Sequence, residues 1–90
     1  MKQFIYKIED PIGIHARPAS ILCKEAGNFE SEIIIESYGK KANFKAVLRV
    51  MGMAIKQGDI VTVTAVGSDE EAAILEFQKL FKENLWTIVS

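Results

Sequence analysis

The chain has few of the residues that build metal sites and disulfides. Its 90 residues include one cysteine, Cys23, and one histidine, His15. One cysteine cannot close a disulfide within the chain, and such scarcity suits a reducing compartment. One His and one Cys also supply too few ligands for zinc or iron, so we expect no metal. We expect Cys23 to pack as a small apolar residue on the first helix.

An excess of one charge and long apolar runs are also lacking. The 11 basic and 12 acidic residues leave a net charge of -1, which argues against a broad nucleic-acid or anionic-membrane surface. The apolar runs are too short to cross a bilayer, and the first residues lack the apolar stretch of a signal peptide. We therefore expect a cytoplasmic protein that neither binds nucleic acid nor inserts into a membrane.

The rest of the composition is that of a globular domain. Hydrophobic residues make up 49% of the chain and charged residues 26%, which is ordinary for such a protein. A chain of 90 residues can bury one core but not two. With no linker, repeat or low-complexity stretch to divide it, we predict a single domain over residues 1–90.

Hydrophobic periodicity predicts the order strand, helix, strand, strand, helix, strand, helix. The expected ranges are 2–8, 16–27, 33–35, 41–44, a short helix within 46–55, 60–66, and a helix beginning near residue 68. Strands and helices mixed in this way predict an α+β fold, with helices packed on one face of an antiparallel sheet. The β-branched run at 60–66 is the strongest strand signal and predicts a central position.

Turn and cap signals refine this order. Gly39 predicts a hairpin turn at 37–40. Ser68 and Glu71 have the spacing of a capping box, in which each side chain would bond the other's free N–H group. The tail at 85–89, which includes Trp86, is more apolar than a frayed terminus. It either packs on the sheet or mediates self-association.

The stretch from Gly13 to Ser20 contains the most informative residues. It places His15 at the predicted start of a helix, where unpaired N–H groups and the macrodipole favour an anion. Arg17 adds a permanent cation whose planar donors match phosphate oxygens, and Pro18 suits a first helical turn. The competing interpretation is a surface or structural histidine, which is common in small domains.

Other chemistries have less support. The chain has no Gly-x-Ser-x-Gly elbow and no Gly-x-x-x-x-Gly-Lys-Ser/Thr phosphate loop. Neutral imidazole, present at cytoplasmic pH, is itself a nucleophile that can attack phosphorus. Arg17 and the helix N–H groups would then supply positioning and charge stabilisation.

The motif Gly-Ile-His-Ala-Arg-Pro-Ala at 13–19 resembles the active-site signature of HPr, the histidine-containing phosphocarrier family of the phosphoenolpyruvate-dependent sugar phosphotransferase system. Asn43-Phe44-Lys45 and the turn at 56–59 also fall where that family has them. The resemblance implies an open-faced sandwich of four antiparallel strands and three helices. It also implies a monomeric carrier with a transient phosphohistidine, no cofactor and no turnover of its own.

The resemblance further implies roles for individual residues. His15 would accept a phosphoryl group on Nδ1 from enzyme I and pass it to the A domains of sugar-specific permeases. The phosphate would be held by Ala16, Arg17 and Pro18. Partners would dock on an apolar surface with a charged rim, to which the resemblance and the charge pattern assign Ser20, Lys24, Lys45, Val47, Leu48, Arg49 and Met51. The competing interpretation of Val47, Leu48 and Met51 is a packing face.

Ala46 is the most informative departure from the family pattern. In many relatives a serine stands there and is phosphorylated by a regulatory kinase, whereas alanine has no hydroxyl group. Arg49 and Ala54, in the second helix and the turn that follows it, stand where the family often has glycine. The missing serine motivates a second interpretation, a paralogue that acts as a regulatory binding module in nitrogen or carbon-flux signalling.

Overall fold

The computed structural model describes residues 1–9, 14 and 16–84. The element order is the one predicted from the sequence. The elements are β1 (Lys2–Lys7), α1 (Ala16–Ala26), β2 (Glu32–Ser37), β3 (Lys40–Asn43), α2 (Val47–Gly52), β4 (Ile60–Val66) and α3 (Glu70–Asn84). The return strand lies one residue earlier than expected, and the tail at 85–89 with Trp86 lies outside the described residues.

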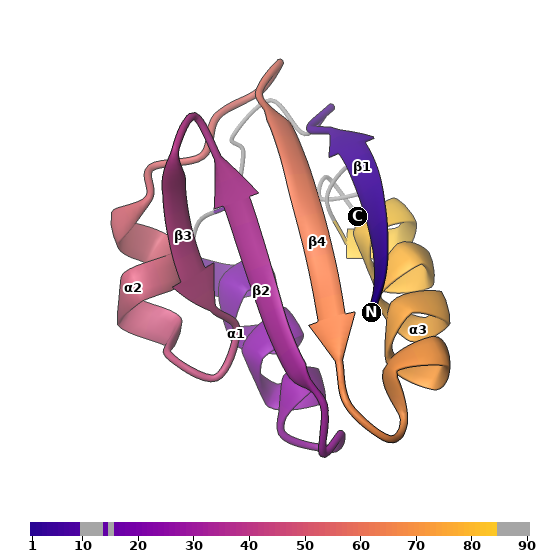
Figure 1. Cartoon of the computed structure of the whole chain (residues 1–90). Helices are drawn as coiled ribbons and strands as arrows, with labels where there is room; N and C mark the ends of the chain where they lie inside the picture. The colour runs from indigo at the N-terminus through magenta and orange to yellow at the C-terminus, as the bar shows by residue number, and fades with distance from the viewer. Residues whose placement is uncertain (10–13, 15, 85–90) are drawn as a thin grey trace.

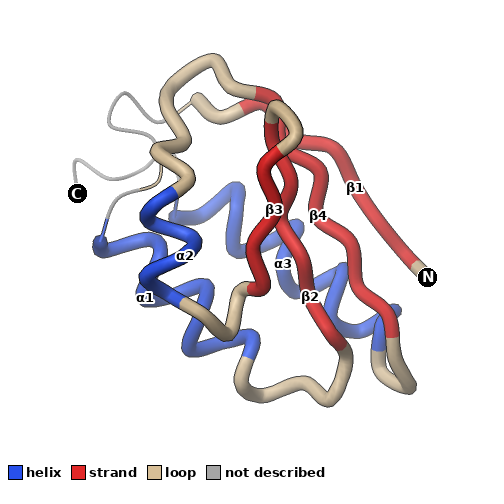
Figure 2. Tube along the Cα trace, turned by 60° about the vertical axis from the view of Figure 1, so that its left-hand side comes forward, coloured by secondary structure: helices blue, strands red, loops and turns tan. Residues whose placement is uncertain are grey.

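The strands form one antiparallel sheet in the order β1-β4-β2-β3. The strand with the strongest sequence signal, β4, is central as predicted, with β1 and β2 as its neighbours. Figure 1 shows the helices behind the sheet, and Figure 2 shows α1 and α2 side by side. The architecture is therefore the predicted open-faced sandwich.

The core fills the space between the sheet and the helices. Ile33, Ile35, Val61 and Val63 are fully buried on the sheet, because alternate residues of a strand point to one face. The matching apolar face of α3 is the predicted one, with Ala73, Phe77, Leu80 and Phe81 all buried. The ring of Phe81 meets Phe4, Tyr6 and Phe44 at centroid distances of 5.5, 5.3 and 6.3 Å.

The hairpin turn between β2 and β3 follows the prediction and adds a detail. Gly39 has φ of 80°, and Tyr38 before it also lies in the left-handed region, with φ of 52°. Positive φ at both central residues matches the right-handed twist of the strands. Glycine accepts this conformation without strain.

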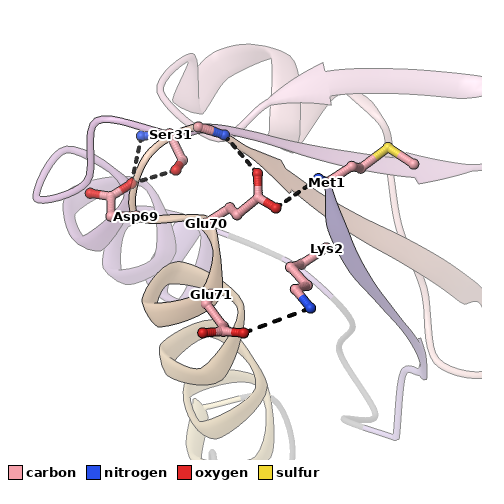
Figure 3. A network of polar contacts seen from close by, with 7 residues as sticks. Met1, Lys2, Ser31, Asp69, Glu70 and Glu71 are labelled. Atoms are coloured by element: carbon pink, nitrogen blue, oxygen red, sulfur yellow. Dashed lines mark hydrogen bonds and ion pairs between the residues drawn. The ribbon is translucent and has the colours of Figure 1, made fainter.

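A network of polar contacts surrounds the N-terminus of α3 (Figure 3). The Met1 ammonium donates to Glu70 Oε2 over 2.7 Å, and the Gly67 amide donates to Glu70 Oε1 over 3.0 Å. Lys2 Nζ lies 3.7 Å from Glu71 Oε2. The hydrogen bonds from the terminal ammonium and from Gly67 lower the pKa of Glu70.

The predicted capping box is wrong in its pairing. The Ser68 hydroxyl donates to Glu30 Oε1 over 3.2 Å, and Glu71 faces Lys2. The same three-residue spacing occurs one position earlier, where the carboxylate of Glu70 accepts a hydrogen bond from the Gly67 amide. The carboxylate still satisfies a free N–H group at the helix start, as such boxes do.

Candidate functional site

Helix α1 begins at Ala16, directly after the single histidine, as the sequence predicts. His15 lies outside the described residues, as do the side chains of Ala16, Arg17 and Pro18. The first amides of a helix have no partner within it and lie at the positive end of its dipole. The chain therefore reaches the start of α1 in a place that suits an anion.

The residue before the histidine is firmly held. Ile14 is 5% exposed, and its amide donates to the carbonyl of Ile55 over 3.0 Å. Ile55 is itself buried and lies in the connection from α2 to β4. This contact could not be predicted from the sequence, because a hydrogen bond between two backbone groups leaves no side-chain pattern.

The apolar segment at 46–55, which includes α2, contains both buried and exposed side chains. Val50, Met53 and Ile55 are buried in the core, whereas the Leu48 side chain is 79% exposed and that of Met51 37% exposed. The sequence predicts that part of this segment either packs inside or meets a partner. The structure shows buried side chains in it beside exposed ones.

Val47 is the intermediate member of the predicted docking set. It is partly buried and packs against the core, so the packing interpretation holds for this residue. Leu48 and Met51 remain available as an exposed apolar pair on the same helix.

The polar residues assigned to the docking surface lie around this pair of helices. Ser20 and Lys24 are exposed on α1, and Arg49 is exposed on α2. The two helices pack against each other (Figure 2). Lys45, just before α2, donates from Nζ to the carbonyl of Phe29 over 3.2 Å. Cationic side chains thus border exposed apolar ones.

Ala46 occupies the N-cap position of α2. Its carbonyl accepts from the amides of Arg49 and Val50 over 3.0 and 3.1 Å, while its side chain makes no capping hydrogen bond. Serine is a favoured N-cap residue because its oxygen can accept from a free amide. Alanine at this position offers neither a cap nor a hydroxyl group.

Cys23 lies on α1 and is half-buried rather than fully enclosed. It packs against the core, and burial raises the pKa of its thiol. A raised pKa leaves less of the reactive thiolate at neutral pH. This placement agrees with the structural role expected for it.

The described part of the chain contains neither a cluster of metal ligands nor a membrane-spanning helix. Over residues 1–9, 14 and 16–84, no three side chains of His, Cys, Asp or Glu gather closely enough to hold a metal ion. Within the same ranges, no helix has both the length and the hydrophobicity needed to cross a bilayer.

Comparison with known proteins adds the context for this geometry. A family model described as the PTS HPr component phosphorylation site matches residues 2–83. The chain is 41% identical over 85 residues to a phosphocarrier protein HPr of Mycoplasma genitalium, covering 93% of this chain and 97% of that protein.

Solved structures agree. A histidine-containing phosphocarrier protein, from work on the divergence of mycoplasma from Gram-positive bacteria, superposes with a TM-score of 0.92 at 40% identity, covering 96% of this chain and 99% of that one. An HPr dimer from Thermoanaerobacter tengcongensis superposes with a TM-score of 0.74 at 35% identity, covering 94% and 98%. Together with the fold and the motif that precedes α1, these matches show that the chain belongs to the HPr phosphocarrier family of the phosphotransferase system.

Proposed function

We propose that His15 accepts a phosphoryl group from enzyme I and donates it to the A domains of sugar-specific permeases. One observation carries the proposal: in a chain of the HPr family, the only histidine directly precedes the first residue of α1, Ala16. Transfer between these partners takes place in the cytoplasm. Phosphoenolpyruvate supplies the phosphoryl group through enzyme I.

The chemistry follows from the residue types. The neutral imidazole of His15 uses its Nδ1 lone pair to attack phosphorus, so an N–P bond forms as the bond from phosphorus to the donor breaks. The positive charge that develops on the imidazole makes it a good leaving group for the next transfer. Amides at the start of α1 and the guanidinium of Arg17 stabilise the phosphoryl oxygens. Ala16 and Pro18 complete this first turn.

Docking brings the donor group and the acceptor imidazole into line on either side of the phosphorus. The exposed side chains of Leu48 and Met51, together with the partly buried Val47, provide an apolar contact surface. Ser20, Lys24 and Arg49 border it, and the cations of Lys24 and Arg49 attract partners with acidic surfaces. Opposite charges raise the rate of encounter more than they raise affinity.

Phosphorylation in a purified system tests the proposal. The protein incubated with phosphoenolpyruvate and enzyme I should gain one phosphoryl group that is lost in acid and kept in base. His15→Ala should abolish the label, and Arg17→Ala should slow its formation by about tenfold or more. Lys79→Ala, which removes an exposed cation on α3, is the control and should behave as the wild type.

The outcomes separate the alternatives. Label that persists in His15→Ala contradicts the proposed acceptor, and absence of label in the wild type contradicts the carrier function. Label that forms but does not pass to any permease A domain supports the regulatory module instead. Ala46 has no hydroxyl group, so a serine kinase has no acceptor at this position.

A further inference from the structure

The connection from α2 to β4, residues 53–59, binds the chain on both sides of residues 10–13, ahead of His15. On the later side, the Ile14 amide donates to the Ile55 carbonyl over 3.0 Å. On the earlier side, the Ile8 amide donates to the Asp59 carbonyl over 2.9 Å, and the Gly58 amide donates to the Ile8 carbonyl over 2.8 Å. One connection therefore binds both Ile8 and Ile14 in the part of the chain that leads to His15.

A side chain of the same connection makes a further hydrogen bond to the chain ahead of His15. Gln57 Nε2 donates to the carbonyl of Glu9 over 3.3 Å. Figure 1 shows the connection at the end of the sheet where β1 finishes and β4 starts, away from the N-terminus of α3. The contacts are thus confined to one end of the molecule.

The connection is itself well fixed at its α2 end. The amides of Met53 and Ala54 donate to the carbonyls of Val50 and Met51 over 3.2 and 3.1 Å. Met53 and Ile55 are buried in the core. Ala54 between them has φ of 54°, which costs a residue with a side chain energy that glycine would not lose. Packing on both sides holds this strained residue in place.

The β4 end of the connection is closed by Asp59. Its Oδ2 accepts from the Lys56 amide over 2.9 Å, and its own amide donates to the Lys56 carbonyl over 3.1 Å. The intervening Gly58 has φ of 92°, which the tight turn requires. The carboxylate of Asp59 therefore shapes the turn whose backbone groups bind Ile8.

We propose that residues 53–59 hold Ile14, the residue before the phosphoryl acceptor, in a constant position relative to the docking helix α2, with Asp59 as a positioning residue. The inference rests on the proposed function. A partner seated on Leu48 and Met51 meets the acceptor in the right place only if α2 and Ile14 keep a constant relation. In-line transfer is sensitive to such placement, since an error of about 1 Å can cost on the order of a hundredfold in rate.

The test compares two substitutions that remove the same charge. Asp59→Asn keeps an oxygen that accepts from the Lys56 amide, whereas Asp59→Ala loses the acceptor. Each variant is assayed as a substrate of enzyme I, with phosphoenolpyruvate in excess and the concentration of the variant varied. Because the surface on α2 is untouched, Asp59→Ala should lower kcat by about tenfold and leave KM within about twofold. Asp59→Asn should restore most of kcat.

A second variant and a control guard against general loss of structure. Gln57→Ala removes only the side-chain bond to Glu9 and should lower kcat by about twofold. Ser31→Ala removes a side-chain hydrogen bond to Asp69 beside the N-terminus of α3 (Figure 3), and it should leave both kcat and KM unchanged. Circular dichroism checks that each variant is folded.

The pKa of His15, measured by NMR titration, gives a readout that does not depend on transfer. The N-terminus of a helix disfavours the protonated imidazole. Displacement of the chain ahead of His15 in Asp59→Ala should therefore raise the pKa of His15 relative to Asp59→Asn, although both lack the carboxylate charge.

The proposal is overturned if Asp59→Ala and Asp59→Asn have the same kcat and the same His15 pKa, or if Ser31→Ala lowers kcat as much as Asp59→Ala. These results leave the proposed function intact when the wild type is phosphorylated on His15. Failure of the wild type to accept phosphate contradicts the proposed function itself, and the His15 titration still reports on the positioning.

Discussion

Asp69 shows how much one half-buried side chain can organise. Its Oδ2 accepts from the Glu30 amide over 2.9 Å, and its Oδ1 accepts from the Ser31 amide over 2.9 Å and also from the Ser31 hydroxyl. Ser31 is fully buried, so its hydroxyl needs this partner. The carboxylate thereby ties the start of α3 to the loop before β2 (Figure 3).

These hydrogen bonds predict an acid-sensitive contribution to stability. The bond from the Ser31 hydroxyl, followed by that from the Glu30 amide, lowers the pKa of Asp69. A carboxyl whose pKa is lower in the folded than in the unfolded chain stabilises the fold above the unfolded value, about 3.9. This stabilisation is lost as the pH falls through the lower, folded value. Asp69→Asn should therefore be less stable than the wild type at pH 7, with a gap that closes in acid.

Urea unfolding at a series of pH values measures that gap. A double-mutant cycle with Ser31→Ala isolates the coupling between the two side chains. The coupling should be present at neutral pH and shrink once Asp69 is protonated. A gap between wild type and Asp69→Asn that stays constant or widens in acid contradicts the assignment.

From the sequence, Asp69 was only a residue within the predicted capping box of Ser68 and Glu71, and that pairing is wrong. Ser68 bonds Glu30, Asp69 bonds Ser31, and Glu70 bonds the Met1 ammonium. All of these partners are distant in the sequence. Local spacing reports which residues can cap a helix, but tertiary contacts decide which of them does so.

At the scale of elements, α2 presents apolar groups that the core does not use. Leu48 is 79% exposed, and if partners bind there, a carboxylate in its place would lose the apolar contact and would repel the acidic surface of a partner. Leu48→Asp should raise the KM for phosphorylation by enzyme I by about tenfold or more, with little change in kcat.

Leu75 supplies the matched control for that substitution. It is also an exposed leucine, 64% accessible, but it lies on α3. Leu75→Asp should leave KM and kcat unchanged, because the docking surface proposed on α1 and α2 is not altered. Equal effects of the two substitutions would show that the added charge acts generally and not through a docking contact.

Most elements could be predicted because their patterns are strong. The β-branched run of β4 and the apolar face of α3 at Phe77 and Phe81 identify those elements. The segment 46–55 was harder, because the buried Val50 and the exposed Leu48 are both apolar. Hydropathy alone does not distinguish an apolar side chain that is buried in the core from one that is exposed on the surface.

The connection after α2 was not predicted at all as part of the site. Its hydrogen bonds to the chain ahead of His15 join backbone groups of Ile8, Ile14, Ile55 and Asp59. Backbone groups are the same in every residue except proline. Only the three-dimensional path of the chain reveals which of them meet.

At the scale of the whole molecule, the open face of the sheet bears on oligomeric state. The strand β1 forms one edge, and Lys2 and Lys7 stand at its two ends. Lysines on an edge strand discourage pairing with another sheet. Ile5 on this strand is nonetheless exposed, as is Ile60 on β4. The residues around them therefore decide whether this face carries an apolar patch large enough for self-association.

The cross-strand register places a polar residue opposite each exposed apolar one. Ile5 pairs with Thr62, Ile60 with Lys7, and Val66 with Glu32. Such alternation prevents a continuous apolar patch of the size that marks an interface. We therefore expect a monomer, and light scattering after size exclusion should give the mass of one chain from about 10 to 500 µM.

Two substitutions on this face test the reason for the monomer as well as the state. Thr62→Ile and Lys7→Leu together join Ile5 and Ile60 into one apolar patch and remove the charge at the end of the edge strand. The double variant should associate over the same concentrations while remaining folded, since the altered side chains lie on the open face. A wild-type mass that rises with concentration contradicts the monomer, and a double variant that stays monomeric shows that the alternation is not its cause.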